Sequence, residues 1–204
     1  MPSATASPAQ TADTLIALLN ERGTGDYIGE SISQLEHSLQ CAQSASKSGG
    51  DDELILASLL HDIGQFLPIE EAKDVSMSIE GTGSVGRVGH EMIGEEYLKG
   101  LGFSKKVSRL VGSHVAAKRY LTAIDSSYYD GLSDASKQSL RFQGGPFEGE
   151  ELEKFKNDPL SGDMVRMRKY DDGAKVVGIE SVTPRVEGYR EMMVRHLEGV
   201  SIQR

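Results

Sequence analysis

The alternation of apolar and polar residues along the chain predicts a protein built mainly from helices. Ser33 and Glu36 form a capping-box pattern, so we expect a helix that starts at Ser33, runs to about residue 48 and stops at the two following glycines. The next helix, ELILASLLHDI, has apolar residues on all its sides rather than along one stripe. Such a helix offers no polar face to solvent, and we therefore expect it to be buried nearly all round.

Further helix signals follow along the rest of the chain. The expected helices are HEMIGEEYLKG, residues 104–121 after the cap Ser104, Ser133 to about Phe142, residues 148–157, residues 159–170, and a terminal helix that Thr183-Pro184 begins. A short strand is expected over residues 175–182, and a loop rich in Gly and Ser over residues 76–89. The pattern predicts an all-α fold, with a disordered N-terminal tail over residues 1–12 and a single helical-bundle domain over residues 13–204.

Composition narrows the possible classes of partner. The net charge is −9 without a basic block, which disfavours nucleic acid as a partner. No apolar run approaches the length of a membrane span, so we expect no membrane partner. The single cysteine, Cys41, excludes an intramolecular disulfide and a cysteine-based zinc site, and we predict a reducing, cytoplasmic location. The oligomeric state is not predicted by any of these features.

The histidines carry the strongest chemical signal. Four of the five lie on four different predicted helices, at positions 37, 61, 90 and 114. His61 is followed directly by Asp62 at the end of the most apolar helix, where a buried carboxylate is costly unless a cation neutralises it. A single helical histidine is more often an ordinary hydrogen-bonded residue, and we interpret His196 in that way. These residues by themselves leave a metal site and ordinary buried histidines both open.

The order of these residues resembles a known family. The pattern H…HD…H…H…D on successive helices is similar to the HD-domain superfamily of metal-dependent phosphohydrolases and oxygenases, with Asp171 in RMRKYDD as the last aspartate. The resemblance implies one metal bound by the first histidine, the doublet and the last aspartate, and a second metal bound by the additional pair. Asp62 would bridge the two metals. The implied ligands are His37, His61, Asp62, His90, His114 and Asp171.

A narrower resemblance covers roughly residues 14–172. The segments YIGE, QLEHSLQCAQ, LLHDIGQF, HVAAKRYL and LSDASKQSLRFQGGP resemble the mixed-valence diiron oxygenases of phosphonate breakdown, the PhnZ type, and myo-inositol oxygenase more distantly. This implies two iron ions, Fe(II) and Fe(III), with O₂ as co-substrate. The implied small-molecule substrate is a 1-hydroxy-2-aminoethylphosphonate, with or without N-methyl groups, cleaved at its C–P bond to a carboxylate and phosphate. Ligand type alone would equally fit manganese, zinc or magnesium.

The same resemblance implies residues around the substrate. Tyr27 resembles a tyrosine that occupies an iron site until substrate displaces it, and Glu30 would accept a hydrogen bond from the substrate's amine. Lys118 lies one helical turn after His114 and could bind the phosphonate. The alternative without a substrate role is that Tyr27 and Glu30 lie in a solvated loop and that Lys118 is part of an ordinary basic helix face. Further substrate-binding candidates are Ser136, Gln143 and Arg168.

Two other functions stay open at this level. The chain could be an HD phosphohydrolase of nucleotides or phosphate esters, or a diiron HD oxygenase with a natural-product substrate. Gln65 stands after HDIG, where many HD hydrolases have a basic residue. Because glutamine cannot supply positive charge to a phosphoester transition state, this residue weighs modestly against hydrolysis.

Overall fold

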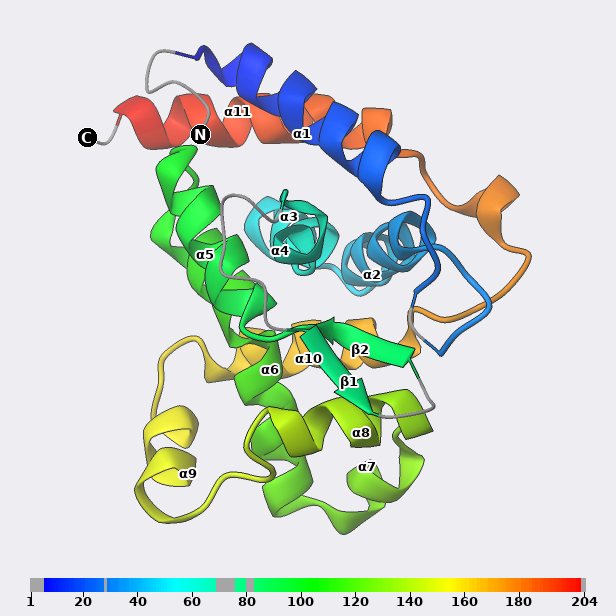
Figure 1. Ribbon diagram of the computed structural model, residues 1–204. Helices are drawn as coiled ribbons and strands as arrows, with labels where there is room; N and C mark the ends of the chain where they lie inside the picture. The colour runs from blue at the N-terminus through cyan, green and yellow to red at the C-terminus, as the bar shows by residue number, and fades with distance from the viewer. Residues whose placement is uncertain (1–5, 28, 69–75, 80–82, 203–204) are drawn as a thin grey trace.

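The computed structural model describes residues 6–27, 29–68, 76–79 and 83–202 and shows a helical bundle (Figure 1). The all-α prediction is confirmed, with one small antiparallel hairpin added beside the helices. The helices are α1 (Pro8–Arg22), α2 (Gln34–Lys47), α3 (Asp52–Leu60), α4 (Ile63–Phe66), α5 (His90–Gly100), α6 (Lys105–Ile124), α7 (Ser126–Gly131), α8 (Asp134–Phe142), α9 (Gly149–Lys156), α10 (Ser161–Gly173) and α11 (Arg190–Ile202). The hairpin consists of β1 (Ser76–Ile79) and β2 (Gly83–Arg87).

Helix α3 forms the centre of the bundle and packs against α2, α6, α10 and α11. All seven side chains from Leu54 to Leu60 are buried, which confirms the expectation of a helix without a solvent face. Burying one leucine or isoleucine side chain stabilises the fold by about 1.5–3 kcal/mol, so this short helix contributes heavily to the core.

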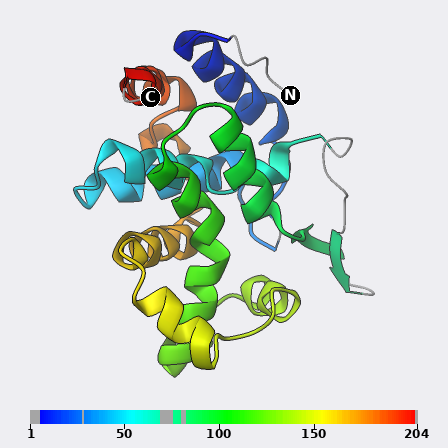
Figure 2. The same ribbon diagram turned by 90° about the vertical axis from the view of Figure 1, so that its left-hand side faces the viewer.

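The two ends of the bundle are covered by different helices. The N-terminal α1 and the C-terminal α11 lie side by side at one end, and α7, α8 and α9 lie at the other (Figures 1 and 2). The long helix α6 connects the two ends and packs against both α5 and α10. Within the described part of the chain, no helix is long and apolar enough to cross a membrane. The cytoplasmic location and the lack of a nucleic-acid partner stay predictions.

Serine caps begin three of the helices where the sequence predicts them. The hydroxyl of Ser33 accepts a hydrogen bond from the backbone N–H of Glu36 at 3.1 Å. Ser104 and Ser133 cap α6 and α8 in the same way. Each cap satisfies one backbone donor that the first helical turn leaves unpaired, and each is worth about 1 kcal/mol. These three helix starts are therefore set by local sequence.

The predicted disorder over residues 1–12 is wrong for its second half. Helix α1 begins at Pro8, and Ser7 and Gln10 form a capping box across its first turn. Thr11 and Ala12 are buried in the bundle. Small polar residues are typical of a tail, but Ser-Pro followed by glutamine is also a helix start, and packing against α11 stabilises this helix. Residues 1–5 lie outside the described part of the chain.

Other local predictions are also corrected by the structure. Residues 175–182 form no strand; they contain an irregular segment and a single 3₁₀ turn (Glu180–Val182). Part of the expected loop over residues 76–89 forms the hairpin. The terminal helix starts at Arg190 rather than directly after Thr183-Pro184, because a separate 3₁₀ turn (Val186–Tyr189) comes first. Short α7 lies in a stretch that reads as a turn.

The break between α3 and α4 brings α5 unusually close. The helix expected through ELILASLLHDI ends at Leu60, and α4 begins at Ile63. A Cβ atom added to Gly64 would lie 2.0 Å from the carbonyl oxygen of His90 and 3.0 Å from the backbone nitrogen of Gly94. Only a residue without a side chain fits this contact, and the contact sets the position of the first residue of α5.

We therefore expect Gly64→Ala to displace the start of α5. Such overpacking against backbone should lower the free energy of unfolding by roughly 1–3 kcal/mol, measured by denaturant unfolding. Gly162→Ala in α10 is the matched control, because no atom lies within 4 Å of the added Cβ there. Equal stability of the two variants would contradict the close contact.

Candidate active site

Four histidines from four elements are oriented by backbone carbonyl groups. His37 lies in α2, His61 ends α3, His90 begins α5 and His114 lies in α6. Each Nδ1 donates a hydrogen bond to a carbonyl oxygen, and the acceptors are Ala174 (2.8 Å), Ser58 (2.8 Å), Arg87 (2.9 Å) and Val111 (2.8 Å), in the same order. Because a carbonyl can only accept, Nδ1 of each ring carries a proton, and in the neutral form of the ring the lone pair is on Nε2.

These lone pairs face one another in two pairs. The Nε2 atoms of His37 and His61 are 3.1 Å apart, and those of His90 and His114 are 2.9 Å apart. Two unprotonated imidazole nitrogens at this distance repel each other unless a cation lies between them. Histidine metal ligands usually donate their other ring N–H to a carbonyl or carboxylate oxygen, as these four rings do. The arrangement could therefore hold a metal ion at each pair of rings.

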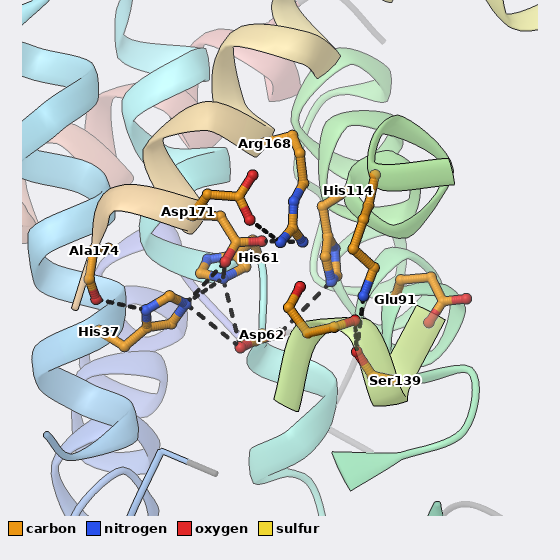
Figure 3. A network of polar contacts seen from close by, with 12 residues as sticks. His37, His61, Asp62, Glu91, His114, Ser139, Arg168, Asp171 and Ala174 are labelled. Carbon is orange, nitrogen blue, oxygen red and sulfur yellow. Dashed lines mark hydrogen bonds and ion pairs between the residues drawn. The ribbon is translucent and has the colours of Figure 1, made fainter. Parts of the chain in front are cut away.

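Two aspartates complete two groups of three ligands. Oδ1 of Asp171 lies 3.3 Å from Nε2 of His37 and 3.9 Å from Nε2 of His61 (Figure 3). Oδ1 of Asp62 lies 3.3 Å from Nε2 of His90 and 3.7 Å from that of His114. The two groups that could each hold a metal ion are therefore His37, His61 and Asp171, and Asp62, His90 and His114.

Asp62 lies between the two groups and faces both. Its Oδ1 atom belongs to the group of His90 and His114, while its Oδ2 atom lies 3.5 Å from Nε2 of His61 and 3.9 Å from that of His37. Consecutive residues of a continuous helix point about 100° apart. The helix break at His61 and Asp62 allows both neighbours to reach one centre. A carboxylate in this position is suited to bridge two metal ions.

The distances and atom types fit first-row transition metals. Ligands about 2.1 Å from one ion lie about 3.0 Å apart across a right angle and about 3.4 Å apart at the tetrahedral angle. Two separations in each group, between 2.9 and 3.3 Å, agree with that requirement. The third separation in each group, 3.9 Å and 3.7 Å, corresponds to a wider angle at the ion. One ion would have three protein ligands and the shared Asp62 carboxylate, and the other would have two histidines and the same carboxylate. Both sets leave coordination positions for small molecules, and a set of imidazole and carboxylate ligands suits iron.

The buried carboxylate of Asp62 requires positive charge between the two ligand groups. Burial would raise the pKa of the Asp62 carboxyl, but the rings of His61 and His90 hold it well below its usual value. Burial would likewise lower the pKa of His61 and His90, yet the Asp62 carboxylate raises both. Burial, with a contribution from His90, lowers the pKa of His114 to about 3. A metal ion bound here would supply the positive charge that protons would otherwise provide.

Asp171 is held by a buried arginine. Burial alone would raise the pKa of its carboxyl, but Arg168 and His37 lower it well below its usual value. The guanidinium of Arg168 donates to Oδ2 of Asp171 at 2.7 Å and also to Asp172, so Asp171 keeps Oδ1 free for the metal group. Arg168 lines the pocket described below, but its positive charge is shared with two aspartates. Its role in substrate binding stays a prediction, and orientation of Asp171 is its visible contact.

A single pocket opens over the two groups and contains every substrate-binding residue that the sequence predicts. Its walls include Tyr27, Glu30, Lys118, Ser136, Gln143 and Arg168, while Asp62, His90, His114 and Asp171 contribute from the metal groups. Among the described residues, the buried side-chain oxygens of Ser136 and Gln143 have no hydrogen-bond partner. Buried polar atoms without partners are costly, so these two residues mark where a polar ligand fits.

Lys118 provides a cation on the pocket wall. Its Nζ donates to Oγ of Ser139 at 2.8 Å. Burial lowers the pKa of this ammonium to about 7, and the charge of Arg168 adds to the effect. An anion placed beside Lys118 would favour the charged form and remove this penalty. Ser139 was not predicted from the sequence, and its spacing of three from Ser136 on α8 is the signal that could have found it.

Tyr27 and Glu30 lie beside the group of His37. The ring of Tyr27 stacks on that of His37, with 3.8 Å between ring centres. Burial raises the pKa of Tyr27 well above its usual value, and the charge of Asp171 raises it further. The carboxylate of Glu30 is engaged by Lys175, a residue that sequence patterns placed in a strand. No local signal marks Lys175, because only the return of the chain after α10 brings it to the pocket.

Gln65 and His196 have structural contacts. Oε1 of Gln65 accepts a hydrogen bond from the backbone N–H of Arg87 at 3.0 Å, which ties α4 to the end of β2 just before His90. His196 lies apart from both metal groups, and its Nε2 accepts from the backbone N–H of Ser104 at 3.1 Å. The interpretation of His196 as an ordinary hydrogen-bonded residue agrees with this contact.

The shared position of Asp62 predicts how metal content responds to substitution. His90→Ala and His37→Ala should each lose one of two bound metal ions, because each removes a ligand from a different group. Asp62→Asn should weaken both, because the bridging charge is lost. Metal analysis after anaerobic reconstitution measures this, with His196→Ala as the control that keeps both ions. Two tightly held ions in His90→Ala would contradict the assignment.

Comparisons with known proteins agree with this geometry. Residues 35–141 match the family model of the HD domain. The chain is 36% identical to a hydroxymethylphosphonate dioxygenase of Gimesia maris, over 94% of this chain and 90% of that protein. It is 35% identical to a [1-hydroxy-2-(trimethylamino)ethyl]phosphonate dioxygenase (glycine-betaine-forming) of Leisingera caerulea, over 89% and 87%. An uncharacterised protein of Acanthamoeba polyphaga mimivirus is 38% identical over 92% and 82%. The chain therefore belongs to the HD-domain family, in the group that includes these two dioxygenases.

Proposed function

We propose that this protein is an O₂-dependent dioxygenase that cleaves the C–P bond of a small 1-hydroxyphosphonate. The substrate RCH(OH)PO₃²⁻ and one O₂ would give a carboxylic acid and phosphate, with both oxygen atoms of O₂ retained in the products. The observation that carries this proposal is the position of Asp62 between two ligand groups at the base of a pocket. The names of the two related dioxygenases support the same reaction class.

The six ligands would hold a pair of iron ions. One would be bound by His37, His61 and Asp171, the other by His90 and His114, with Asp62 shared. Iron bound there would supply Lewis acidity for the substrate's oxygen atoms and electrons for the activation of dioxygen. Arg168 keeps the Asp171 carboxylate in place, and the backbone carbonyls keep the four rings in the ligating tautomer.

The pocket walls would bind and orient the phosphonate. Lys118 supplies positive charge one helical turn from His114, and the hydroxyl of Ser136 has a free buried oxygen on the same wall. The amide of Gln143 offers a further polar contact. Together these groups would fix the phosphonate so that its hydroxyl-bearing carbon faces the metal groups. Tyr27 covers His37 and, being protonated, could leave that position when substrate enters.

The reaction class is tested with hydroxymethylphosphonate and the iron-reconstituted protein. We expect phosphate and formate to form in equal amounts in air and neither to form without oxygen. Electron paramagnetic resonance before and after controlled oxidation would report whether a coupled pair of iron ions is present. Phosphate release from phosphate esters in the absence of oxygen would instead favour a hydrolase.

The assignment of Lys118 is tested separately. Removing a charge-assisted hydrogen bond to the phosphonate costs about 1.5–3 kcal/mol, so Lys118→Met should raise KM by about tenfold to a hundredfold. Lys154→Met on α9 is the control, since this exposed lysine lies outside the pocket. An unchanged KM in Lys118→Met would remove the lysine from the binding site while leaving the reaction class intact.

A further inference from the structure

The pocket contains an ion pair that is absent from the sequence predictions. Nζ of Lys175 lies 2.8 Å from Oε1 of Glu30, and both side chains are only 19% exposed. The same ammonium donates to Oγ of Ser133 at 3.1 Å and lies 5.9 Å from the centre of the Tyr27 ring. Two segments of the pocket wall, the turn that carries Tyr27 and Glu30 and the start of α8 at Ser133, therefore hold Lys175 in one position. The pair is more than a solvated surface contact, since solvent screening is limited there.

This pair removes the negative charge that would attract an amine. Apart from Asp62 and Asp171 of the metal groups, Glu30 is the one carboxylate among the described residues that line the pocket. Its charge is matched by Lys175. Arg168 is matched by its own aspartates, and Lys118 adds positive charge. The wall outside the metal groups is thus neutral or positive.

A substrate with a cationic distal group would meet a double cost in this pocket. To reach Glu30 it would have to separate Lys175 from its carboxylate, leaving that ammonium largely buried with the hydroxyl of Ser133. It would also place a second positive charge beside Lys175, and juxtaposed like charges in a desolvated site are strongly unfavourable. A distal group without positive charge would meet neither cost.

We propose that Lys175 is a specificity-determining residue, which acts as an internal counterion of Glu30 and selects 1-hydroxyphosphonates whose distal end carries no ammonium. This inference rests on the proposed function and restricts its substrate class. It also changes the meaning of Glu30: the residue predicted to bind a substrate amine instead binds an amine of the protein itself. The glycine-betaine-forming relative and the hydroxymethylphosphonate relative would then mark the two alternatives that this pocket distinguishes.

The experiment compares two substrates that differ in this charge. Hydroxymethylphosphonate and 1-hydroxy-2-(trimethylamino)ethylphosphonate are assayed in air with the native protein, Lys175→Met, Lys175→Arg and the control Lys137→Met. Lys137 lies on neighbouring α8, is half-buried, donates to the backbone oxygen of Asp130 and does not line the pocket. The native protein, Lys175→Arg and Lys137→Met should all prefer the uncharged substrate in kcat/KM. Lys175→Met should shift the ratio toward the trimethylammonium substrate by about tenfold or more, because Glu30 becomes free.

Binding keeps this test independent of turnover. Anaerobic Kd values for both phosphonates, measured with the same four proteins, should show the same change in ratio. A native preference for the trimethylammonium compound, or an unchanged ratio in Lys175→Met, would overturn the role of Lys175 while oxygen-dependent phosphate release still upheld the proposed function. Absence of turnover of both compounds would count against the proposed function, and the Kd ratio would then decide the role of Lys175.

Discussion

The structure depends on one buried carboxylate that two sets of imidazoles share. Asp62 faces His61 and His37 with one oxygen and His90 and His114 with the other. A negative charge in the interior is tolerable only with positive charge beside it, and neutral imidazoles cannot provide that. The arrangement therefore favours a cation between the two groups. The helix break after Leu60 is part of the same solution, because it turns two successive side chains toward one centre.

The surrounding bundle fixes the positions from which these ligands point. Helix α3 is buried on every side, so the doublet at its end cannot shift without disturbing the core. Gly64 allows α4 to contact His90, the first residue of α5. The hydrogen bond from the backbone N–H of Arg87 to Gln65 holds the segment that precedes α5. Backbone carbonyls then set each ring's orientation. Because carbonyl groups are part of rigid elements, the ligand lone pairs are directed before any metal binds.

Similarity to known dioxygenases leaves the substrate's distal group open. The two relatives named as phosphonate dioxygenases differ in that group, and the chain is nearly equally similar to both. The fold and metal ligands can be shared while pocket walls differ, so function must be argued from the site. Here the wall carries Lys118, two unpaired polar oxygens and the pair of Glu30 with Lys175. The positive charge of Lys118 favours an anionic group at one end of the substrate. The pair of Glu30 with Lys175 disfavours a cationic group at the other end.

The all-α fold class and the helix starts at Ser33, Ser104 and Ser133 followed from the sequence alone, because periodicity and helix caps are local signals. The six residues that converge on the centre were also found from the sequence, because their order along the chain is a family-level signal. The sequence did not reveal that residues 8–12 continue into a helix, since their burial depends on α11 from the other end of the chain. Nor could it pair Lys175 with Glu30, which are 145 positions apart. A contact between residues so far apart in the sequence forms only when the chain has folded. No periodicity or local motif in the sequence marks it, because it depends on which segments pack around the pocket.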